Sequence, residues 1–255
     1  DHNRSKNLFV KVKAVEVQIW LTPVEDMMAL KQTIQSLVSV AEIPSHCVGD
    51  IFRALTARVS VAPTLGRLLL DLSVWWATLS PPAASPRLLV DAWAMLLKRG
   101  LPPQHVATAL VGVLDATVEG KWRSMTGGVQ QAVIWIIATH ASVLAGLTSE
   151  GGVWQTTGQQ DMLCGTSCLD ALVLRLNHIA VYATHELRLA AVDALGRLSL
   201  FLPDPHRIEL FEVLSRLARS PAAGMSMAAA PYLALLDRVY FLEERKLNGE
   251  NIGDD

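Results

Sequence analysis

Charged residues are scarce in this sequence, and neither sign predominates among them. Only 18% of its 255 residues are Asp, Glu, Lys or Arg, and the formal net charge is −2. Nucleic-acid-binding domains usually have a basic excess gathered on one face. The composition therefore argues against that class of function, and we expect no nucleic acid among the partners.

Cysteine is scarce as well. The three cysteines, Cys47, Cys164 and Cys168, are too few and too unevenly placed for a disulfide framework. This favours a reducing, cytoplasmic compartment. Cys164 and Cys168 precede His178 and His185, but zinc sites usually have more closely paired ligands. We interpret these cysteines as ordinary thiols and expect no metal site.

Several catalytic signatures are missing. The sequence has no phosphate-binding glycine loop, no Gly-x-Ser-x-Gly and no His-Glu-x-x-His. We therefore expect a protein that is not an enzyme and that needs no cofactor. Residues 1–6 are polar and do not form the apolar segment of a signal peptide, and the first residue is not Met. We expect the chain to be a segment of a longer protein.

Proline, in contrast, recurs about once every twenty residues between apolar runs of helical length. Proline is well tolerated at the first position of a helix, because the N–H that it lacks would have no helical partner there. A helix and turn of about twenty residues, or a pair of about forty, is the period of HEAT and armadillo repeats. The prolines in this pattern are Pro23, Pro44, Pro63, Pro82, Pro102 and Pro103.

The spacing of apolar residues predicts an all-α fold, a HEAT/armadillo-like α-solenoid of about ten to eleven helices. An apolar content of 51% suits helices that are buried on two sides, or free faces that are covered by partners. The expected divisions are helical repeats at 1–147, an irregular loop or insertion at 148–165, helical repeats at 166–247 and a flexible tail at 248–255.

The strongest repeat signal lies at residues 184–196. An Arg near the start of the helix, paired small residues, and then Ala and Leu before Gly are typical of the second helix of a HEAT unit. Small residues let neighbouring helices approach closely. We predict that Leu187, Val192 and Leu195 fill the seam between helices.

One stretch, residues 129–147, is nearly long and apolar enough to span a bilayer. It contains Gln130, Gln131, Thr139 and His140, whose polar groups are costly in hydrocarbon. We predict a single buried helix of a helical stack there.

A small basic cluster lies near the N-terminus. Lys6 and Lys13 are seven residues apart and share one face of the expected helix, whereas Lys11 lies off that face. One interpretation is a contact with an anionic lipid or an acidic partner, and the other is a solvated face of a terminal repeat. The cluster consists of Arg4, Lys6, Lys11 and Lys13.

Five segments together resemble the trunk of the large Src-homology-3-domain-carrying subunit of the plant TPLATE (TSET) endocytic adaptor complex. In chain order these segments are 5–14, 129–135, 186–195, 208–218 and 235–240. They read SKNLFVKVKA, VQQAVIW, ELRLAAVDAL, IELFEVLSRLA and LLDRVY. The Src-homology domain itself is not in this sequence.

The resemblance implies a non-catalytic scaffold in clathrin-mediated endocytosis. Its partners would be other adaptor-complex subunits, and it would lie in the cytoplasm, peripheral at the plasma membrane or a vesicle coat. An alternative is a generic HEAT-type protein-binding module in transport or regulation. We also expect the outer sides of the terminal helices, together with the irregular segment, to be the faces that partners cover.

Overall fold

The part of the chain that the structure describes is helical, as the prolines and the apolar periodicity predict. The computed structural model describes residues 2–23, 26–39, 45–62, 65–77, 86–114, 122, 125–145, 168–202 and 206–247. These residues form twelve α-helices and one π-helical turn, with no β-strand among them. The predicted all-α, solenoid-like fold is confirmed. The expected loop at 148–165 and the expected tail at 248–255 lie outside the described residues.

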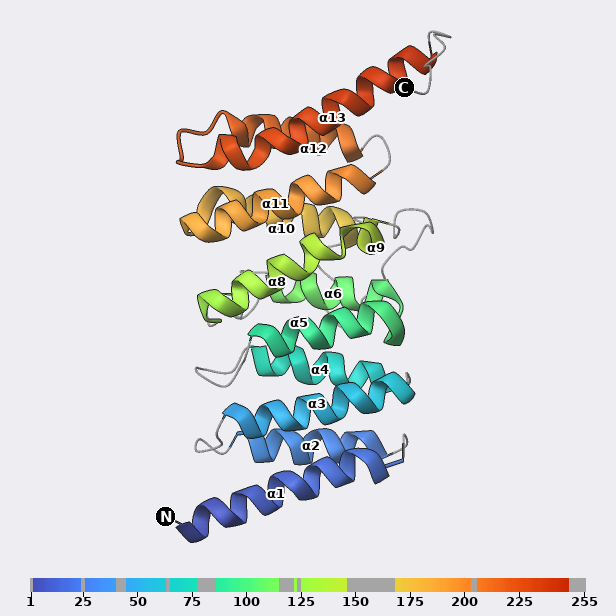
Figure 1. The fold of residues 1–255 in the computed structure, drawn as a ribbon, viewed down its shortest axis with the longest axis vertical. Helices are drawn as coiled ribbons and strands as arrows, with labels where there is room; N and C mark the ends of the chain where they lie inside the picture. The colour runs from blue at the N-terminus through green and yellow to red at the C-terminus, as the bar shows by residue number, and fades with distance from the viewer. Residues whose placement is uncertain are drawn as a thin grey trace, which may run out of the picture. The chain divides into compact units, whose positions relative to one another are not determined.

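Two compact units divide the chain, Asp1–Ile136 and Ile137–Asp255. In the first unit, α1, α3 and α5 contact one another in turn, and α2, α4 and α6 do the same (Figure 1). The helices are α1 (His2–Leu21), α2 (Met27–Val38), α3 (Ser45–Val61), α4 (Gly66–Ala77), α5 (Pro86–Met95) and α6 (Pro103–Leu114). A π-helical turn, η3 (Leu96–Gly100), continues α5, and α8 (Gly127–Thr139) ends in the second unit.

Large aromatic side chains form the core of the first unit. The Phe52 and Trp76 rings stack with centroids 4.3 Å apart, and both side chains are buried. The indole N–H of buried Trp93 donates to the Ser73 hydroxyl, which itself donates to the Leu70 carbonyl oxygen. A buried indole N–H without an acceptor would be costly, and Ser73 supplies that acceptor for Trp93.

In the second unit α11 is the central helix. It contacts α9, α10, α12 and α13, while α13 packs on both α11 and α12. The bounds are α9 (Ala141–Ala145), α10 (Cys168–Tyr182), α11 (His185–Phe201), α12 (His206–Ala218) and α13 (Met225–Leu247). Leu187, Val192 and Leu195 are all buried on α11, which confirms the predicted seam.

Two boundaries differ from the expected ones. The single helix predicted at 129–147 is divided into α8 and α9, and the His140 carbonyl oxygen accepts from the N–H groups of Val143 and Leu144 to begin the second piece. The described helices therefore number twelve, one more than the upper prediction. The second helix begins at Met27, four residues after the proline that was expected to open it.

Candidate interaction surfaces

The first helix is apolar on two sides, and only one of them is covered. Val12, Val15 and Ile19 are buried, and α1 contacts α3 and α2. A second apolar set is exposed, and the 3.6-residue turn places it within an arc of about 120°. This α1 outer face consists of Phe9 (56% exposed), Val10 (64%), Val17 (55%), Trp20 (43%) and Leu21 (75%).

Polar neighbours hold two aromatic rings of the α1 outer face. The Arg58 guanidinium of α3 lies 5.8 Å from the centroid of the Trp20 ring, and the Lys13 ammonium lies 5.6 Å from that of Phe9. Such cation–π contacts fix a ring without removing it from solvent. The two aromatic side chains therefore have cationic neighbours and remain largely exposed to solvent.

The predicted basic cluster is only partly described. The Lys13 ammonium lies 2.8 Å from a Glu16 carboxylate oxygen, and this hydrogen bond raises the pKa of Lys13. Lys11 is exposed. The backbone of Arg4 and Lys6 lies in α1, but their side chains are outside the description. The structure gives Lys13 an acidic neighbour, so its charge is partly balanced.

The last described helix also presents an apolar face to solvent. On one side of α13, Leu236 and Ala229 are buried, whereas residues at helical spacing on another side of the same helix are exposed. Met227 is 82% exposed and Leu235 47%. The α13 outer face consists of Met227, Ala230, Pro231, Ala234 and Leu235. The sequence suggested exposed faces at the terminal helices, but not which side chains form them.

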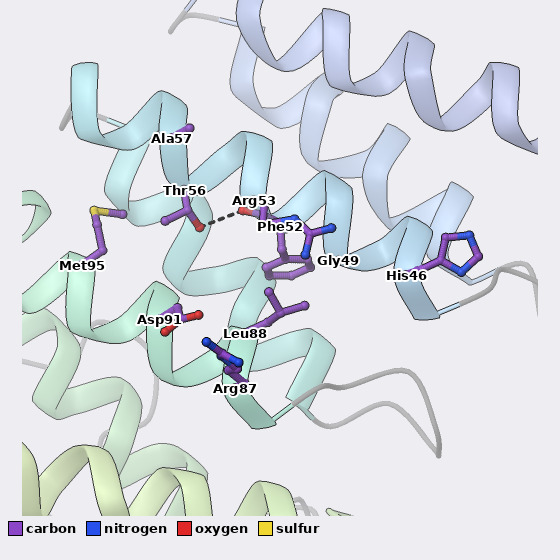
Figure 2. Close-up of a pocket in the computed structure, with 10 residues that line it drawn as sticks. All are labelled: His46, Gly49, Phe52, Arg53, Thr56, Ala57, Arg87, Leu88, Asp91 and Met95. Carbon is purple, nitrogen blue, oxygen red and sulfur yellow. Dashed lines mark hydrogen bonds between the residues drawn. The ribbon is translucent and has the colours of Figure 1, made fainter.

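A groove of about 840 Å³ lies between α3 and α5 in the first unit (Figure 2). Gly49 brings the two helices together there, since a Cβ at this position would lie 3.1 Å from the Leu88 Cδ1. Arg53 forms an ion pair with Asp50, and Arg87 and Asp91 line the groove on α5. Charges of both signs are present, so the groove has no clear preference for an anionic or a cationic ligand.

The cysteines and the apolar stretch at 129–147 are the remaining candidates from the sequence. The Cys47 and Cys168 side chains are buried, and Cys164 lies outside the described residues. Of the helices that the structure describes, none is long and apolar enough to cross a membrane. The described part of the apolar stretch, 129–145, is divided between α8 and α9.

Comparison with known proteins gives one relative of known assembly. Neither a family model nor a solved structure matches the chain. The chain is similar to "TSET complex member tstB" of Dictyostelium discoideum, with 19% identity over 227 residues. The match covers 84% of this chain but 25% of the relative, so the chain spans about a quarter of that protein.

Proposed function

We propose that this chain is a HEAT-type, non-catalytic trunk segment of a heteromeric TSET/TPLATE-type adaptor complex. It would act in clathrin-mediated endocytosis, in the cytoplasm and peripheral to the membrane. Within such a complex we assign it to the large subunit that carries a Src-homology-3 domain. The similarity to a TSET complex member supports the assembly. The observation on which the proposal depends is the exposed α1 outer face.

The α1 outer face is too apolar to be favourable in water. Fully burying a large apolar side chain contributes about 1.5–3 kcal/mol, so covering the exposed parts of these five side chains would contribute about 4–9 kcal/mol before the costs of association. Clustered exposed apolar side chains mark interaction sites more often than ordinary surface does. We propose that an apolar helix face of another subunit covers them.

The test is site-specific photo-crosslinking in the full-length protein in its own cells. A benzophenone side chain is placed at Val17, on the α1 outer face, and in the control at the neighbouring Gln18, which is exposed but points about 100° away. We expect a crosslink to a second polypeptide from position 17 and little from position 18. Crosslinks only within the same polypeptide, or equal yields at both positions, would overturn the proposal.

For the basic cluster we propose a contact with an acidic segment of a partner. Lys11 lies off the face that holds Lys13, and Lys13 is paired with Glu16. A flat anionic membrane would require the cations to be gathered on one side. An acidic partner segment that runs along the helix can instead contact each of these cations in turn. The residues proposed are Arg4, Lys6, Lys11 and Lys13.

A further inference from the structure

A second groove lies wholly within the second unit, between α10 and α12, and it differs in charge from the groove between α3 and α5. Its volume is about 590 Å³. The lining residues include two arginines and no carboxylate. They are Leu174, Asn177, His178, Ala180, Val181, Tyr182, Arg188, Arg216, Leu217 and Ser220.

One side of this α10/α12 groove is an exposed apolar stripe. Leu174 is 57% exposed, Val181 40% and Tyr182 73%, and their spacing places them on one side of α10. The His178 ring lies against the Tyr182 ring, with centroids 4.7 Å apart. These side chains offer a contact surface for the apolar side chain of a ligand.

The two arginines are held in place at the groove. The Arg188 Nε donates to the Ala183 carbonyl oxygen at 2.7 Å, which caps the end of α10. The Arg216 Nη2 lies 3.4 Å from the Asn177 Oδ1, which joins α12 to α10. A guanidinium has five N–H donors, and each of these bonds uses one. Positioned guanidinium groups bind carboxylates at a low entropic cost.

Two carboxylates, those of Asp170 and Glu212, differ in how they can affect the positive charge of Arg188 and Arg216. Asp170, on α10, faces His206, with 3.4 Å between its Oδ1 and the His206 Nδ1. Glu212 precedes Arg216 by one turn of α12 and lines the neighbouring hollow with Arg219. Glu212 is therefore the carboxylate that a ligand would have to displace or tolerate.

We propose that the α10/α12 groove binds a short acidic and apolar peptide segment of another protein. An apolar side chain of the peptide would lie on Leu174, Val181 and Tyr182, and a neighbouring Asp or Glu would meet Arg188 and Arg216. The groove is within the usual volume range of ligand sites. This inference does not depend on the adaptor assembly, since it concerns a different face in the second unit.

The test is selection of short random peptides, displayed on phage, against the full-length protein. We expect the enriched peptides to combine an acidic residue with a large apolar one. Their affinity, measured by fluorescence anisotropy, should fall about tenfold or more for Arg216→Glu, because a like charge then faces the ligand. It should also fall as salt is raised.

The matched control is Arg219→Glu, which makes the same charge change three residues later, just after the end of α12 and outside this groove. It should change the affinity much less than Arg216→Glu. Tyr182→Ala, on the exposed stripe, should also weaken binding without altering the circular dichroism of the protein. Crosslinking at α1 can fail while this test succeeds, and the reverse is equally possible.

Three results would overturn the inference. The first is that no peptide is enriched over a selection without protein. The second is that enriched peptides lack acidic residues or bind Arg216→Glu as well as the parent protein. The third is that inositol hexakisphosphate or anionic vesicles displace the peptides while Tyr182→Ala has no effect, which would indicate a phosphate site instead.

Discussion

Replacing Gly196 by alanine tests how closely α11 and α13 pack. A Cβ built at Gly196 would lie 2.2, 2.3 and 2.6 Å from three atoms of the Tyr232 ring. Real Cβ atoms essentially never approach closer than 3.0 Å, so the ring or a helix must move. The ring is not free to swing away, because the Tyr232 hydroxyl donates to Asp193 and Asp193 pairs with the Arg197 Nε at 3.0 Å.

The expected cost follows from three contributions. Forcing a methyl group into a packed seam costs about 1–3 kcal/mol. Losing the hydrogen bond between Tyr232 and the Asp193 carboxylate costs about 1.5–3 kcal/mol. Alanine returns about 1 kcal/mol through its better helix propensity. Gly196→Ala should therefore lower the free energy of unfolding by about 1.5–5 kcal/mol.

The assay is urea unfolding followed by circular dichroism, and the matched control is Gly112→Ala. Gly112 is exposed in α6, and a Cβ there would meet nothing within 4 Å. That control should be stabilised by about 0.5–1 kcal/mol. In a Tyr232→Ala background the penalty of Gly196→Ala should disappear, because the ring has gone. If Gly196→Ala stabilises the protein, or if the two changes are additive, the proposed packing is wrong.

Three further outcomes are expected. Leu195→Asp, at a fully buried position, should lower the free energy of unfolding by several kcal/mol, whereas Phe201→Asp, at an exposed position of the same helix, should not; thermal melts will show this. Burial, and then the Asp193 hydrogen bond, raises the pKa of Tyr232 to about 12. The contribution of Tyr232 to stability is therefore complete below about pH 10 and is lost as the pH rises towards 12. Urea titrations at each pH should show that Tyr232→Phe lacks this pH-dependent part of the stability. Neutralising the basic cluster should reduce co-purification of partners from cells but leave flotation with phosphatidylserine vesicles unchanged. Reduced flotation would indicate a lipid contact instead. The substitutions are Arg4→Gln, Lys6→Gln, Lys11→Gln and Lys13→Gln.

The helices could be predicted because their signals are local. Pro86 and Pro103 are the first residues of α5 and α6, as their missing N–H groups and fixed φ require. The same rule was less accurate for Pro23, since α2 begins only at Met27. Pro231 lies inside α13, where the sequence indicated no break. The chemistry of a proline does not by itself fix its position within a helix, because tertiary packing can keep the helix continuous.

The sequence could not say which apolar side of α1 is covered. Phe9, Val12, Trp20 and Ile19 are equally apolar, yet Val12 and Ile19 are buried while the other two are exposed. The distinction depends on where α3 lies, and α3 begins more than twenty residues after the α1 outer face. Periodicity therefore identifies an apolar helix, and only its neighbours decide which side remains for a partner.

Contacts between helices that are not adjacent in sequence are the remaining gap. The repeat pattern at 184–196 indicated close packing through small residues, but it did not indicate that the Tyr232 ring, two helices later, lies against Gly196. In the α10/α12 groove the apolar residues Leu174 and Tyr182 come from one helix and Arg216 from another. Neither helix alone has the pattern of a binding site. The combination of charge and apolar surface arises only when alternate helices of a stack lie side by side, so a sequence read one helix at a time cannot show it.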